Sequence, residues 1–125
     1  MDGNVYSIAV KGDGIYVGGS FTSAGGLPAK NIAVWNRSTH QWNAMKGGVS
    51  GATFPYVAAL AVEKNNVYVG GLFTQAGGAL VSNIAIWDGE QWKRVGTGTN
   101  DAVFAMVIYN DTLYAAGKFS TAGVS

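Results

Sequence analysis

The hydrophobic positions of the chain gather in three short runs of equal length. They occupy residues 5–10, 57–62 and 103–108, and each run is apolar at nearly every position. Six apolar residues without alternation are typical of a strand buried on both faces, because a half-exposed strand alternates and a helix needs more length. We therefore predict three buried strands in similar surroundings.

A turn and a second strand follow each run. The turns are residues 11–14, 63–66 and 109–112, and the second strands are residues 15–17, 67–69 and 113–115. Glycine, asparagine and aspartate recur in these turns, and tight hairpin turns select such residues because they tolerate positive φ. The pattern predicts three antiparallel hairpins.

Two more strands are predicted in each of the first two copies of this pattern. Glycine-rich segments at residues 22–26 and 74–78 lead into them, and glycine accepts positive φ there without strain. The third strands are residues 31–35 and 83–87, and the fourth strands are residues 41–45 and 91–95. Each pair of outer strands is expected to form a hairpin.

The spacing of these strands identifies a repeat. Tyr16, Tyr68 and Tyr114 each lie 11 residues after the start of a first strand, and they are 52 and 46 residues apart. Four antiparallel strands in a repeat of this length form one blade of a β-propeller. We predict an all-β fold of about two and a half blades. The predicted blades are residues 5–56 and 57–102, with a partial blade at residues 103–125.

The propeller assigns a place to each strand. Its first strand lines a narrow central channel, which suits small side chains such as Ser7, Ala58 and Ala105. Its fourth strand is the outer edge, where Lys93 and Arg94 guard against pairing with another sheet. Both faces of each blade are expected to pack against neighbouring blades.

The repeat motif itself resembles a known family. Residues 68–78 read Tyr-Val-Gly-Gly-x-Phe-Thr-x-Ala-Gly-Gly, residues 83–87 read Asn-Ile-Ala-x-Trp, and residues 87–92 form Trp-Asp-Gly-x-x-Trp. Together they resemble a kelch-like or galactose-oxidase-like β-propeller repeat over nearly the whole chain. Such repeats are common in secreted bacterial proteins and in fungal cortical cell-polarity proteins, so the resemblance implies a secreted or cell-surface location. The first repeat departs from the motif at Asn36, which no glycine follows.

Composition narrows the classes of partner. Only 12% of residues are charged and 48% are apolar, about half the usual charge, so most positions are expected to be buried in a core or against other subunits. The net charge of +1, without a basic run, does not indicate a nucleic acid partner. No cysteine is present for a disulfide or a thiolate metal site. The first residues do not form a signal peptide, and no apolar run is long enough for a membrane span.

Two and a half blades do not close a ring. A propeller needs at least four blades, so both end faces of this segment are apolar surfaces that require cover. Either the segment is part of a longer propeller, natural or recombined, or several copies associate head to tail as a homo-oligomer.

The sequence does not predict a catalytic site. The seven carboxylates lie near the start or in predicted turns, where turn formation accounts for them: Asp2, Asp13, Glu63, Asp88, Glu90, Asp101 and Asp111. A glycosidase would need two of them about 5–10 Å apart across a sugar. The single histidine, His40, is predicted in a solvated loop with no carboxylate behind it. We expect neither a metal site nor a cofactor, and no enzymatic activity.

The four tryptophans are the candidate binding residues. Trp35 with Trp42, and Trp87 with Trp92, are predicted to face each other across the two outer hairpins. The favoured interpretation is packing between blades. The alternative is sugar binding, because the Trp-Asp-Gly-x-x-Trp element is similar to one in small fucose-binding bacterial lectins, which also build a propeller from short chains. The favoured function is accordingly a non-enzymatic structural or protein-interaction module, and the alternative is a carbohydrate-binding lectin assembled from several chains.

Overall fold

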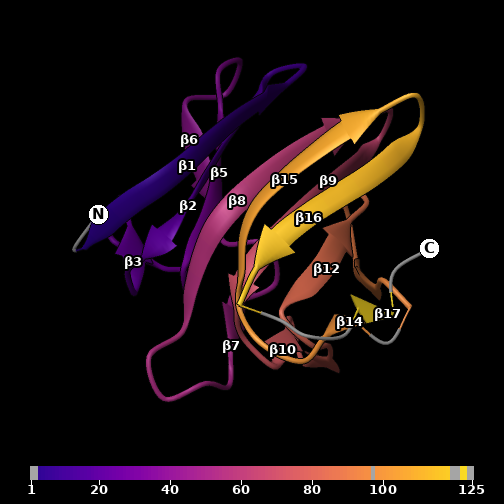
Figure 1. Cartoon of the computed structure of the whole chain (residues 1–125). Coiled ribbons are helices and arrows are strands. Elements are labelled where there is room, and N and C mark those ends of the chain that lie inside the picture. Colours follow the sequence, from indigo (N-terminus) through magenta and orange to yellow (C-terminus); the bar gives the residue numbers. More distant parts are fainter. Residues whose placement is uncertain (1–2, 97, 119–121, 124–125) are drawn as a thin grey trace.

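The computed structural model describes residues 3–96, 98–118 and 122–123, with side chains given through residue 118. These residues form strands and turns and no helix (Figure 1). The predicted all-β fold is confirmed.

Two four-stranded antiparallel sheets form the body of the chain. The first has the order β1-β2-β5-β6 and the second the order β8-β9-β12-β13. The strands of the first sheet are β1 (Asn4–Lys11), β2 (Gly14–Ser20), β5 (Ile32–Asn36) and β6 (Gln41–Asn43). Those of the second sheet are β8 (Tyr56–Glu63), β9 (Asn66–Leu72), β12 (Ile84–Trp87) and β13 (Trp92–Arg94). The third repeat contributes the antiparallel pair β15 (Val103–Tyr109) and β16 (Thr112–Gly117). Every strand predicted from the hydrophobic pattern is present.

The inner hairpins turn through two residues each. Gly12, Lys64, Asn110 and Asp111 have φ between 50° and 62° in these turns. Positive φ in a two-residue turn matches the right-handed twist of the two strands. Glu63, which we expected in a turn, is instead the last residue of β8 and pairs with Asn66.

Two-residue strands form as well, which the hydrophobic pattern did not predict, and some of them tie successive repeats together. They are β3 (Ser23–Ala24), β4 (Leu27–Pro28), β7 (Val49–Ser50), β10 (Gln75–Ala76), β11 (Ala79–Leu80), β14 (Gly98–Thr99) and β17 (Ala122–Gly123). The connector strand β7 leaves the first repeat and pairs with β10 of the second. The connector strand β14 leaves the second repeat and pairs with β17 of the third. Both links use the same position in the repeat.

A buried asparagine fixes the path of each connector. Asn31 has φ of 68°, and its side chain accepts the Phe21 N–H at 3.2 Å and donates to the Val49 carbonyl at 2.9 Å. Asn83 has φ of 66° and makes the matching bonds at 3.1 Å to Phe73 and Thr99. Asparagine tolerates this left-handed conformation better than most residues. Each repeat therefore places the next one through an equivalent latch.

The sheets stack so that β1, β8 and β15 lie side by side (Figure 1). Gly18 on β2 faces Val57 on β8, and a Cβ built at Gly18 would lie 2.4 Å from Val57 Cγ1. Gly70 on β9 faces Val103 on β15 in the same way, at 2.8 Å. Only glycine permits this approach without a shift, so the two contacts between repeats are equivalent.

The expected burial of the first strands on both faces is correct only in part, and only for the middle one, because residues 58 and 60–62 of β8 are half-buried. Val57 and Ala59 of β8 are buried, because β8 has a repeat on each side. The prediction is wrong for β1 and β15 in this chain, where Ile8 is 64% exposed and Val107 is 58% exposed. These two strands lie at the ends of the stack, and within the described residues no further repeat covers them.

Candidate functional site

The two tryptophan pairs form as predicted, across the outer hairpins. Trp35 on β5 pairs with Trp42 on β6, with ring centroids 5.4 Å apart and planes tilted by 60°. Trp87 on β12 pairs with Trp92 on β13, at 5.2 Å and 56°. Tilted aromatic pairs of this kind stabilise a hairpin beyond the area that they bury. The outer hairpin is therefore a preformed unit in both repeats.

The turns that present the pairs differ in sequence and agree in structure. Asn36 Oδ1 accepts the N–H groups of Ser38 and Thr39 at 2.8 and 3.0 Å. Asp88 Oδ1 accepts those of Glu90 and Gln91 at 2.9 and 2.7 Å. These backbone hydrogen bonds, helped by Lys93 at 3.4 Å, lower the pKa of Asp88 below its ordinary value. The acceptor oxygen, and not the charge, is the shared requirement.

The second pair is buried between the two sheets. Trp87 is 5% exposed and Trp92 is 8% exposed. The Trp92 indole N–H donates to the Met45 carbonyl at 2.7 Å, and the Trp87 side chain is hydrogen-bonded to the Tyr16 hydroxyl. Burial raises the pKa of Tyr16, and the hydrogen bond with Trp87 partly opposes that shift. The pair forms a wedge between the sheets, and the first repeat supplies hydrogen-bond partners for its indole N–H groups. Its burial favours the interpretation that these tryptophans pack between repeats.

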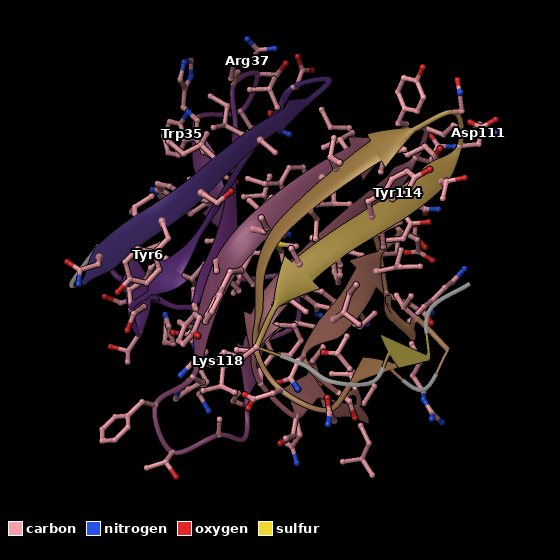
Figure 2. The ribbon with its side chains drawn as sticks, viewed as in Figure 1. Tyr6, Trp35, Arg37, Asp111, Tyr114 and Lys118 are labelled. Atoms are coloured by element: carbon pink, nitrogen blue, oxygen red, sulfur yellow. The ribbon has the colours of Figure 1, made fainter. Side chains whose placement is uncertain are left out.

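The first pair lies on an open face. Trp35 and Trp42 are half-buried, and Trp42 packs beside a small cluster that includes Val17 and Ala33. His40 is exposed, as predicted, with its ring centroid 6.1 Å from that of Trp35. Trp35 projects at the end of the first sheet in Figure 2. The residues that are buried in the second repeat are therefore only half-buried in the first.

A cavity of about 340 Å³ runs between the two outer hairpins. Trp42 and Trp87 line it together with the polar residues Asp13, Gln41 and Asn43. An aromatic ring beside convergent polar groups is the chemistry that holds a sugar. One tryptophan of each pair therefore lines this cavity.

A second cavity, of about 430 Å³, lies between the second and third repeats. Tyr68, Ile86 and Val95 line it from the second repeat, and Thr112 and Leu113 line it from the third. Sequence reasoning missed Tyr16 and Met45 as partners of the second tryptophan pair. The fixed interval between tyrosine and tryptophan was the available signal.

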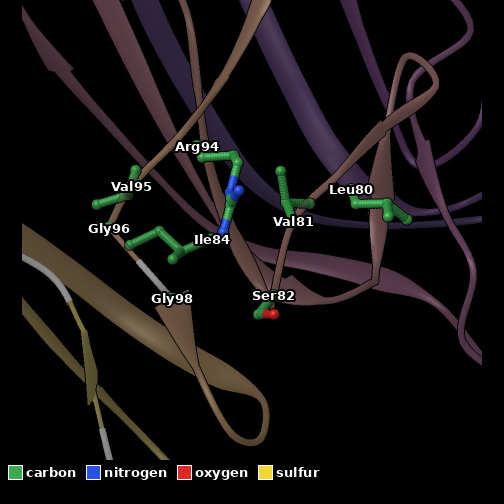
Figure 3. Close-up of a pocket in the computed structure, with 8 residues that line it drawn as sticks. All are labelled: Leu80, Val81, Ser82, Ile84, Arg94, Val95, Gly96 and Gly98. Carbon is green, nitrogen blue, oxygen red and sulfur yellow. The ribbon is translucent and has the colours of Figure 1, made fainter.

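Two further cavities lie near the connectors. One of about 470 Å³ is bordered by Lys30 and by Phe54, which is 81% exposed. A smaller one of about 180 Å³ is shown in Figure 3, where Arg94 is the one charged residue among the eight labelled lining residues.

The described residues contain no group of three or more metal-ligating side chains. Within the same residues, no helix is long and apolar enough to cross a membrane. No protein-family model matches this chain, and no curated protein matches it either.

Proposed function

We propose that this chain is a segment of a β-propeller that serves as a non-enzymatic structural and interaction module. The supporting observation is that one junction geometry occurs twice, with Val57 on Gly18 and Val103 on Gly70. Sheets that stack repeatedly through the same contact, with their first strands side by side, are the components of a propeller. The kelch-like motif of residues 68–92 supports the same proposal.

The interaction surfaces are the two ends of the stack. Val5, Ile8 and Val10 on β1 are 43–64% exposed. Phe104, Val107 and Tyr114 on β15 and β16 are 45–58% exposed. Figure 2 shows Tyr6 and Tyr114 projecting from these strands. Apolar strand faces of this kind are characteristic of surfaces that bind another protein. Further repeats, in other copies of the chain or elsewhere in a longer one, are the proposed partners.

Light scattering coupled to gel filtration tests whether copies of the chain provide that cover. We expect a mass that is a multiple of 13.0 kDa. Ile8→Lys or Val107→Lys should reduce the mass to that of one chain, because a charge is costly to bury in an apolar contact. Leu80→Lys, at a site that is 71% exposed away from both ends, is the matched control and should leave the mass unchanged. A single chain at every concentration would contradict ring closure by association.

A carbohydrate-binding lectin is the second candidate. The cavity beside Trp42, with Asp13, Gln41 and Asn43, is the observation that favours it. We propose that a sugar ring would stack on Trp42 there. Glycan-array binding that is lost in Trp42→Ala, in a variant that still folds, would support this function. The absence of binding to any glycan on the array would contradict the lectin function.

A further inference from the structure

The two junctions between repeats begin from equivalent residues. A tyrosine on the second strand, an aliphatic residue on the third strand and an apolar residue shortly after the fourth strand face the next repeat. They are Tyr16, Val34 and Met45 in the first repeat and Tyr68, Ile86 and Val95 in the second. These three positions are therefore equivalent at both junctions, and the charged residues Glu63, Arg94 and Asp111 also line the second one.

The first junction shows what this surface receives. The outer hairpin of the second repeat inserts Trp87 and Trp92, which hydrogen-bond to the Tyr16 hydroxyl and the Met45 carbonyl. Tyr16 is then 6% exposed and Met45 is fully buried. Two indole N–H groups and two apolar rings complete the contact.

At the second junction, only the inner hairpin β15–β16 of the third repeat packs against the second repeat. β15 packs on β8 and β9, as β8 packs on β1 and β2, so the inner half is equivalent. In the outer half, the cavity of about 430 Å³ stands between Tyr68 and Leu113. Tyr68 is half-buried, whereas Tyr16 is buried. The open volume lies where the first junction holds its tryptophans.

One edge of the adjacent strand is open as well. β2 pairs with β1 and β5, and β9 pairs with β8 and β12. Among the described strands, β16 pairs with β15 alone. An unpaired strand edge presents a row of backbone N–H and C=O groups that another strand can join.

We propose that the free edge of β16 and the cavity beside Tyr68 form one slot, and that this slot binds a β-hairpin carrying a cross-strand tryptophan pair. The inference rests on the proposed function as a propeller segment. The hairpin adds a strand to β16, and its two indole N–H groups donate to the Tyr68 hydroxyl and the Val95 carbonyl. Its occupant is a hairpin of the kind formed by residues 82–96. The first junction is the established interface that this contact continues.

A peptide of residues 82–96 is the probe, and the same peptide with alanine at both tryptophan positions is its control. Hydrogen–deuterium exchange of residues 112–117 in the full chain reports addition of a strand to β16. We expect saturable binding with exchange slowed at least about tenfold, and binding at least about tenfold weaker for the peptide without tryptophan.

Two variants of the full chain sharpen the assay. Tyr68→Phe removes one hydroxyl and should weaken binding about three- to tenfold. Phe54→Ser removes an exposed aromatic ring outside the slot and should leave the affinity unchanged.

A chain with residues 80–96 fused behind residue 125 supplies the hairpin without a requirement for a free peptide to fold. Its β16 amides should be protected, and replacement of both fused tryptophans by alanine should abolish the protection.

Three results would overturn the proposal. One is the absence of protection in the fused chain. Another is equal binding of the peptides with and without tryptophan. A third is protection of β16 in the fused chain that persists when both fused tryptophans are replaced by alanine. The mass measurement on Ile8→Lys is independent of these results, so failure of the slot is distinguishable from failure of the propeller proposal.

Discussion

The junction between the first and second repeats is complete, and the junction between the second and third is complete only in its inner half. Both have a glycine receiving a valine, at Gly18 and Gly70. Only the first has a tryptophan wedge, and there Met45 is fully buried. The difference shows that the repeats stack through their inner hairpins, and that the outer hairpin, where it is present, buries the remainder of the junction.

The largest expected effect is loss of the wedge. Trp92→Ala removes a buried ring and one of the two donors to the Met45 carbonyl, so unfolding by denaturant should show a loss of about 3–5 kcal/mol. Trp42→Ala, at the same position on the open face, should lose about 1–2 kcal/mol because its ring is half-buried. Equal losses at the two positions would show that the two junction faces are not different.

The second-largest loss of stability is expected from substitution of the asparagine latches, Asn31 and Asn83. Asn31→Ala removes two buried hydrogen bonds and places a Cβ-bearing residue without a polar side chain at φ of 68°, so we expect a loss of about 2–4 kcal/mol. Asn83→Ala should lose a similar amount, since its bonds are equivalent. Asn31→Gly restores the freedom of the backbone and separates the two contributions. Thermal unfolding of the three variants tests whether the latches are alike although the junctions differ.

A methyl group at the glycine contact gives a smaller effect. Gly18→Ala should destabilise the chain by about 1–3 kcal/mol, because Val57 is held from both sides and cannot move away. Gly70→Ala should cost less, because β15 and β16 belong to the less enclosed repeat and can shift. Denaturant titration of both variants measures the difference, and a larger loss for Gly70→Ala would contradict it.

The smallest effect depends on pH. The pKa of Asp88 is lowered in the folded chain, so its charge adds stability above the unfolded pKa, and that stability is lost as pH falls through the folded pKa. Asp88→Asn keeps the acceptor oxygen, so its melting temperature should be slightly lower than that of the parent near pH 7 and equal to it in strong acid. Asn36→Asp should introduce the same pH dependence into the first repeat. A difference for Asp88→Asn that is constant over this pH range would contradict the assignment.

Much of the fold could be predicted from the sequence because the three copies of the repeat can be compared with one another. Three apolar runs at a constant distance from a tyrosine predict the inner hairpins, and the tryptophan spacing predicts the outer ones. The strand pairs that link repeats were not predicted because their pairing depends on connectors that come from the preceding repeat. Val49 pairs with Ala76, and nothing local to either residue indicates that partner.

The candidate site was harder to predict for a related reason. Trp35 and Trp87 occupy the same position in the repeat, and the sequence assigns them the same surroundings. One is half-buried and the other is buried, since burial depends on which neighbour each face has. Local sequence determines the pair, and the number of repeats around it determines its role.

The equivalence of the two inner contacts is the claim on which the account depends, and nuclear Overhauser effects test it most directly. We expect cross-peaks from the Gly18 α-protons to the Val57 methyl groups, and from the Gly70 α-protons to the Val103 methyl groups, in one spectrum. The presence of only the first set, or of neither, would contradict a chain built from repeats that stack in the same way.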